Sequence, residues 1–184
     1  VFGNFAYLAS GDSYKLGIYD ISDPSIISHV ASYNPGGPVE EVVEVNDILY
    51  VATGGGTDRL HIVNVSDHSL PVQIGTIPTG GSKVVKVVGD SLFVGTGDAL
   101  ALVDISNPLS PLSIENFTLP SSTRSLDIMN STAYITCKND GLAVIDVSQY
   151  LTSTASLAQS LIIDSLEDRK LTSMTVSAQA WLPS

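Results

Sequence analysis

The sequence is poor in three features that mark common protein classes: cysteine, long apolar runs and basic residues. Cys137 is its single cysteine, so no disulfide can form within the chain. This thiol lies in the apolar segment AYITC (133–137) with no histidine or acid directly beside it, which predicts a small buried side chain rather than a reactive one. No apolar run approaches the roughly 18 residues of a membrane-spanning helix, so membrane insertion is not expected.

Lysine and arginine are scarce. The chain has eight of them against 19 aspartates and glutamates, which gives a formal net charge of −11. Such a surface repels phosphates, so neither nucleic acid nor an anionic membrane is expected as a partner. A hydrophobic content of 43% is too high for a disordered chain, and 184 residues are enough for one domain or for part of a repeat array. Because the chain starts at Val1 without a methionine or signal peptide, we expect it to be processed or to be a piece of a longer protein.

The feature that is present is an internal repeat. Five segments share a pattern centred on an aromatic residue: NFAYLAS (4–10), DILYVAT (47–53), DSLFVGT (90–96), STAYITC (131–137) and AQAWLPS (178–184). Their aromatic residues, Tyr7, Tyr50, Phe93, Tyr134 and Trp181, are 43, 43, 41 and 47 residues apart. A period in this range indicates a repeat array. We therefore predict a single repeat domain over 1–184, with repeats at 3–45, 46–88, 89–129 and 130–177 and the start of another at 178–184.

Each period reads as four short antiparallel strands. An alternating segment such as VEEVVEV (39–45) meets a tight turn, the aromatic strand follows, and a Gly/Asp-rich hairpin leads to a third and a fourth strand. The tight turns are Asn46-Asp47, Gly89-Asp90 and Asn130-Ser131. Four strands in about 43 residues are typical of a propeller blade. The predicted fold is all-β: a β-propeller of about four four-stranded antiparallel blades, with the aromatic strand second from the axis, as part of a larger propeller or assembly. The stretch 154–170 could be read as a helix, but a strand with a longer loop is favoured.

The third strand of each repeat ends in a recurring motif. Its copies are LGIYDISDPS (16–25), HIVNVSDHSLP (61–71), ALVDISNPLSP (101–111) and AVIDVSQY (143–150). The residues that close the strands are Asp20, Asn64, Asp104 and Asp146. A short carboxylate or amide at this place can accept backbone N–H groups of the turn that it begins, which predicts a structural corner rather than a catalytic acid.

These motif strands resemble the LVIVD-repeat family, named for the strand that ends in the aspartate. ALVDISNPLSP and AVIDVS match closely, and HIVNVSDHS matches less well because Asn64 stands in the aspartate position. The resemblance covers essentially the whole chain. It implies a β-propeller, usually in secreted or surface-attached bacterial and archaeal proteins. It implies no shared enzymatic activity and no catalytic residues.

Candidate metal ligands are sparse. The three histidines, His29, His61 and His68, show no HxH or HxxxH spacing and are expected to be scattered on the surface. Four aspartates recur in the second hairpin and are the calcium candidates: Asp12, Asp58, Asp98 and Asp140. Calcium takes about 6–8 oxygen ligands, whereas each loop offers one or two carboxylates, so turn chemistry is the simpler explanation. No nucleophile elbow, phosphate loop or dinucleotide motif occurs in the required context, so no cofactor and no enzymatic activity are expected.

Two further sets of residues remain. In the predicted innermost strands, the same place is occupied by Val43, Lys86, Asp127 and Met174. Lys86 and Asp127 would then face each other across the channel or lie on one blade surface. A ligand site in the channel is the alternative to a solvated pair, which is favoured. Three Asn-x-Ser/Thr sequons begin at Asn64, Asn116 and Asn130, which makes these the glycosylation candidates. Asn130 in a hairpin turn and Asn116 on an outer strand are predicted to be accessible, whereas Asn64 belongs to a corner.

The leading functional hypothesis is a non-catalytic extracellular or cell-surface scaffold or adhesion module, including a filament or surface-layer component. Its partners would be proteins or further copies of the chain, bound through open sheet edges, together with glycans. The alternatives are a carbohydrate- or small-ligand-binding propeller with a site at the channel mouth, and an enzyme whose active groups lie outside this chain. Val1 and Phe2 correspond to the end of an innermost strand, so 171–177 would supply a fifth such strand, and 178–184 repeats the phase of 4–10. The chain therefore overruns four repeats, and three arrangements stay open: a segment of a larger propeller, strand exchange between chains, and a self-closed ring with a displaced tail.

Overall fold

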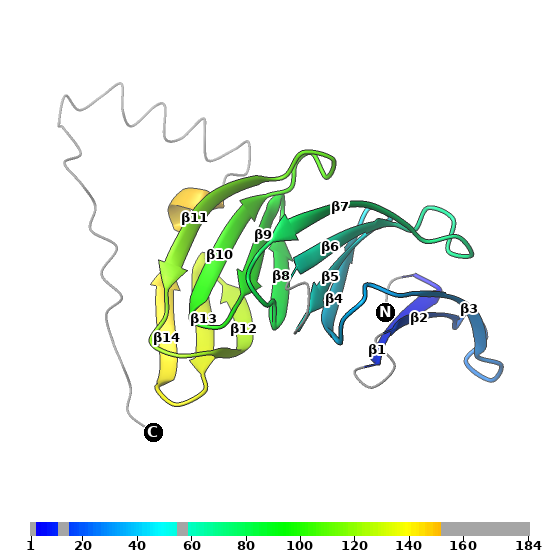
Figure 1. The fold of residues 1–184 in the computed structure, drawn as a ribbon, viewed down its shortest axis with the longest axis horizontal. Helices are drawn as coiled ribbons and strands as arrows, with labels where there is room; N and C mark the ends of the chain where they lie inside the picture. Colours follow the sequence, from blue (N-terminus) through cyan, green and yellow to red (C-terminus); the bar gives the residue numbers. More distant parts are fainter. Residues whose placement is uncertain (1–2, 11–14, 55–58, 152–184) are drawn as a thin grey trace.

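The computed structural model describes residues 3–10, 15–54 and 59–151, which form four antiparallel β-sheets (Figure 1). No α-helix occurs in these ranges, and a single 3-10 turn covers Ser148–Tyr150. The predicted all-β fold is confirmed. The stretch 154–170, the strand expected at 171–177 and Trp181 lie outside the described residues.

Two central sheets have the four strands expected of each repeat. Sheet 2 consists of β4 (Val39–Val45), β5 (Ile48–Thr53), β6 (Arg59–Asn64) and β7 (Val72–Pro78). Sheet 3 consists of β8 (Val84–Val88), β9 (Ser91–Gly95), β10 (Ala99–Asp104) and β11 (Leu112–Thr118). In both, the strands pair in chain order.

The two terminal sheets have three strands each in the described part of the chain, rather than the four predicted. Sheet 1 consists of β1 (Phe5–Ser10), β2 (Lys15–Asp20) and β3 (Ser28–Tyr33). Sheet 4 consists of β12 (Thr123–Met129), β13 (Thr132–Cys137) and β14 (Gly141–Asp146). Sheet 1 starts at its aromatic strand, and the segment expected to form the outer strand of sheet 4 follows residue 151, beyond the described ranges.

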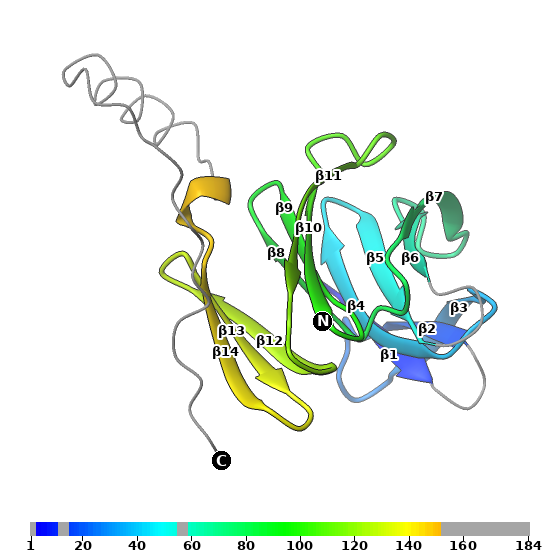
Figure 2. The same ribbon diagram turned by 60° about the vertical axis from the view of Figure 1, so that its left-hand side comes forward.

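The sheets follow one another in an arc, with sheets 1 and 4 at its two ends (Figures 1 and 2). Neighbouring sheets approach each other through their first strands: β1 contacts β4, β4 contacts β8, and β8 contacts β12. This is the arrangement of propeller blades around an axis, and the described residues do not close it into a ring.

The predicted tight hairpins are confirmed by the backbone. Asn46 and Asp47 have φ of 52° and 62°, and Asn130 and Ser131 have φ of 49° and 62°. Gly89 takes the first position of the equivalent turn with φ of 57°. Positive φ at both central residues matches the twist of the flanking strands, and asparagine, aspartate and glycine tolerate it best.

Three hydrophobic clusters lie between consecutive sheets. Side chains alternate along each strand, so a central sheet buries both faces: in β5, Leu49 and Val51 belong to the cluster shared with sheet 1, and Tyr50 belongs to the cluster shared with sheet 3. This two-sided burial explains why β5 and β9 are continuous apolar runs.

The repeated aromatic residues of the two central sheets pack between neighbouring sheets. Tyr50 is 1% exposed and Phe93 is fully buried. Tyr7 packs in part against the cluster between sheets 1 and 2. Tyr134 is half-buried, because its face of sheet 4 points away from sheet 3.

Candidate functional site

The four recurring Asp/Asn residues form structural corners, as predicted. In each corner the side-chain Oδ1 accepts a hydrogen bond from the backbone N–H of the serine two residues later. The distances are 2.8 Å for Asp20–Ser22, 2.9 Å for Asn64–Ser66, 2.8 Å for Asp104–Ser106 and 2.9 Å for Asp146–Ser148. This hydrogen bond holds the pKa of the Asp20, Asp104 and Asp146 carboxyls below the usual value. A carboxyl used in this way closes a turn and needs no catalytic role.

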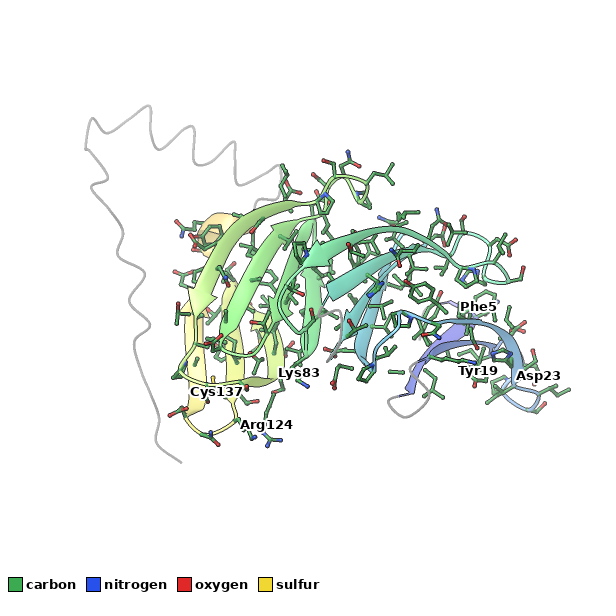
Figure 3. All side chains as sticks on the ribbon, viewed as in Figure 1. Phe5, Tyr19, Asp23, Lys83, Arg124 and Cys137 are labelled. Atoms are coloured by element: carbon green, nitrogen blue, oxygen red, sulfur yellow. The ribbon has the colours of Figure 1, made fainter. Side chains whose placement is uncertain are left out.

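A second turn follows each of the first three corners, and it was not predicted. Asp23 Oδ1 accepts the Ser25 N–H at 2.9 Å and the Ser25 hydroxyl at 2.6 Å, and Asp67 repeats both contacts with Ser69. Asn107 accepts the Leu109 N–H at 3.1 Å. Figure 3 shows Asp23 at the outer end of sheet 1. The signal available in the sequence is the repetition of Asp or Asn three residues after the first corner residue.

The calcium candidates do not form a described site. Asp98 and Asp140 are exposed in their hairpin loops, and Asp12 and Asp58 lie outside the described residues. Within the described ranges, no group of three or more His, Cys, Asp and Glu residues could hold a metal ion.

The three histidines are not all surface residues, so that prediction is wrong for His61. His61 is 5% exposed within β6, where its Nδ1 lies 2.9 Å from the Tyr33 hydroxyl. His68 stacks on Phe5 with ring centroids 3.6 Å apart and thereby joins the corner of sheet 2 to sheet 1. His29 is exposed, and its Nε2 lies 2.8 Å from the Ser32 hydroxyl. His61 is buried because it lies in β6, a strand that neighbouring sheets cover on both faces.

The predicted pair Lys86–Asp127 is a salt bridge of 3.0 Å, with side chains 46% and 68% exposed. It joins β8 to β12 in the neighbouring sheet, so the two residues do not face each other across a channel. Lys83 and Glu40 make an equivalent contact of 3.0 Å between sheets 3 and 2. Next to it, Glu41 Oε2 accepts the Val85 N–H of β8 at 2.7 Å. These contacts connect the first strands of neighbouring sheets, and we assign them a structural role.

The three sequon asparagines lie where the sequence places them. Asn130 is exposed in the β12–β13 turn, and Asn116 is exposed on the outer strand β11. Asn64 is half-buried, and its side chain accepts both the N–H and the hydroxyl of Ser66. Asn116 and Asn130 are therefore the accessible members of the set.

Cys137 lies in β13 (Figure 3). It is 5% exposed, and burial raises the pKa of its thiol. Its Sγ lies 3.9 Å from the Ile135 carbonyl oxygen. The predicted burial of this thiol is confirmed.

Among the described residues, each of the two terminal sheets has one face that no neighbouring sheet covers. On sheet 1, Leu8 is 56% exposed, although its counterparts in the other sheets, Val51, Val94 and Ile135, are fully buried. Tyr19 lies on the same face, with its ring over Gly17 (Figure 3). On sheet 4, the half-buried Tyr134 occupies the position of the buried Tyr50 and Phe93. One end of the arc thus presents the face that an inner sheet turns toward the preceding sheet, and the other end presents the face that an inner sheet turns toward the following one.

A pocket of about 400 Å³ opens between sheets 2 and 3, beside the outer strands β7 and β11. Its wall on sheet 2 includes Ile77, and its wall on sheet 3 includes Ala101, Val103, Ser113 and Asn116. It is remote from the first strands, so it does not lie at the channel mouth where the sequence placed a ligand site.

Comparison with known proteins identifies the repeat. The family described as LVIVD repeat matches residues 1–35, 36–79, 79–118 and 121–153, which are four consecutive copies. No curated protein matches the sequence. In the described part of the chain, no helix is long and apolar enough to cross a membrane.

Proposed function

Since the chain belongs to the LVIVD-repeat family, we propose that it is a non-catalytic scaffold module that assembles with further copies outside the cell or at the cell surface. The acidic composition and the structural use of the recurring aspartates support this proposal. A surface location is tested by protease treatment of intact cells, which should remove the protein without lysis.

One observation carries the proposal: both ends of the arc present faces that the inner repeats bury. Leu8 at one end and Tyr134 at the other are equivalent to residues that are fully buried or nearly so in sheets 2 and 3. A face of sheet 4 is built to receive the next sheet, and a face of sheet 1 is built to receive the preceding one. Contact between them is head-to-tail, and such contacts propagate into rings or filaments.

The experiment is a measurement of mass in solution by light scattering over a range of protein concentrations. We expect the chain to associate as concentration rises and Leu8→Arg to abolish association, because the variant places a charge in the contact. Leu109→Arg is the matched control, since Leu109 is 72% exposed in the corner loop between β10 and β11 of the central sheet 3. A wild-type chain that stays monomeric throughout, or equal loss in both variants, would contradict the proposal.

Small-ligand binding is a second candidate function, and the pocket beside β7 and β11 favours it. The carbohydrate or small-ligand alternative therefore keeps a physical basis, at a different place in the fold.

A further inference from the structure

Neighbouring sheets diverge toward their outer strands, and the resulting wedge between sheets 1 and 2 is filled by three polar side chains. The Tyr33 hydroxyl donates to Gln73 Oε1 at 2.6 Å and lies 2.9 Å from His61 Nδ1. His61 Nδ1 in turn lies 3.1 Å from Gln73 Oε1. Burial raises the pKa of Tyr33 to about 12, as expected for a hydroxyl held inside an interface.

The strand register identifies the equivalent residues in the next wedge. Ile77 is the equivalent of Tyr33, because Ile77 pairs with Leu60 as Tyr33 pairs with Leu16. Ser113 is the equivalent of Gln73, because Ser113 pairs with Val103 as Gln73 pairs with Val63. His61 in β6 corresponds to Ala101 in β10. Between sheets 2 and 3, three large polar side chains are thus replaced by Ile77, Ala101 and Ser113, and the pocket is the space that they leave.

The third wedge is closed by an aromatic pair. Phe117 is the counterpart of Tyr33 and Ile77, and Tyr150 packs edge-on against it with ring centroids 5.7 Å apart. The pocket therefore occurs at the one described wedge in which the repeat supplies no ring.

The side chains that line the pocket suit an uncharged, amphipathic ligand. Its floor is apolar, since Ile77 is 7% and Val103 2% exposed. Ser113 and Asn116 stand on the same face of β11, and their side chains form no hydrogen bond with other described residues. No ionisable side chain lines the pocket, so a charged ligand would lose its hydration without gaining a counter-charge.

We propose that this pocket binds a neutral monosaccharide ring, with its apolar face on Ile77 and Val103 and its hydroxyls on Ser113 and Asn116. A volume of about 400 Å³ is at the small end of ligand pockets, which suits a single ring. This inference deepens the second candidate function and does not depend on assembly.

Asn116 is also a sequon residue, so a glycan attached to it and a free sugar in the pocket exclude each other. Protein made in a bacterial host without N-glycosylation is therefore the material to test. Glucose, galactose, mannose and N-acetylglucosamine serve as probes in ligand-observed saturation-transfer NMR, with glucuronate and p-cresol as charged and phenolic comparisons. We expect saturation transfer to at least one neutral sugar, and none to glucuronate.

Two variants test the location. Ile77→Tyr/Ala101→His/Ser113→Gln copies the filled wedge and should abolish binding, with a circular-dichroism melt verifying the fold. Asn116→Ala leaves the core untouched and should weaken binding about tenfold, because it removes one hydrogen-bonding side chain.

Repeating the titration in Leu8→Arg separates this inference from assembly, since Leu8 is on the outer face of sheet 1 and does not line the pocket. The inference is overturned if none of the four sugars binds, if binding persists unchanged in the filled variant, or if p-cresol or glucuronate competes equally well.

Discussion

A single side-chain oxygen sets each corner of this protein. The oxygen belongs to a carboxylate in Asp20, Asp104 and Asp146 and to an amide in Asn64, with nearly the same distance to the following serine N–H. The corner thus needs an acceptor and not a charge. The sequence predicts this role because the residue recurs at a strand end before a Ser, whereas a catalytic acid would have no reason to recur.

The charge nevertheless has a consequence at low pH. Because the folded pKa of these three aspartates lies below the unfolded value of 3.8, their contribution to stability is present above that value and is lost as pH falls through the folded pKa. We expect the triple variant Asp20→Asn/Asp104→Asn/Asp146→Asn to lose less melting temperature than the wild type between about pH 6 and pH 3.

Asp90→Asn/Asp98→Asn/Asp140→Asn is the control for the change in net charge, because it also removes three carboxylates and these exposed ones belong to no corner. Thermal melts at a series of pH values make the comparison. Equal acid sensitivity of the wild type and the triple variant would show that the corner carboxylates do not carry the pH dependence.

Strands and hairpins could be predicted from the sequence because their signals are local. Asn46-Asp47 and Asn130-Ser131 take the positive φ that a two-residue hairpin needs, and the aromatic residue fixes the phase of the repeat. The bulges between the third and fourth strands could not be predicted from the sequence, since a register shift such as that at Ile62/Val63 depends on the partner strand.

The pocket was equally out of reach of the sequence. It depends on the combined volume of side chains from two sheets across a wedge, and Ile77 and Ala101 can be matched to Tyr33 and His61 only once the strand register is known. The burial of His61 was missed for the same reason: in a sheet covered on both faces, alternation no longer separates inside from outside.

The equivalent aromatic residues of β5 and β13 provide a test of this two-sided packing. Tyr50 is 1% exposed between two sheets, so Tyr50→Ala should cost about 3–5 kcal/mol of unfolding free energy. Tyr134 is half-buried, and Tyr134→Ala should cost about 1 kcal/mol. Denaturant unfolding of both variants at a concentration where the chain is monomeric makes the measurement. Similar losses would mean that the Tyr134 face is covered as completely as that of Tyr50.

At the scale of the whole molecule, the described residues form an open linear array. In the described residues, the main contacts between sheets join neighbours in the chain, and each of the three clusters is shared by one pair of consecutive sheets. The stability of such an array is approximately a sum of sheet terms and nearest-neighbour interface terms. A terminal sheet has one interface to lose, whereas a central sheet has two.

This asymmetry predicts local unfolding from the ends. Ile18 is fully buried in the cluster between sheets 1 and 2, so Ile18→Ala should weaken that interface by about 2–5 kcal/mol. We expect amide hydrogen exchange in β1–β3 to become at least about tenfold faster, with little change in β12–β14, because an end sheet can detach without disrupting the others. Ile135→Ala, in the cluster between sheets 3 and 4, is the reciprocal variant and should accelerate exchange in β12–β14 instead. Hydrogen exchange followed by mass spectrometry resolves the four sheets. Equal acceleration throughout both variants would mean that the four repeats unfold as one cooperative unit, as blades in a closed ring do.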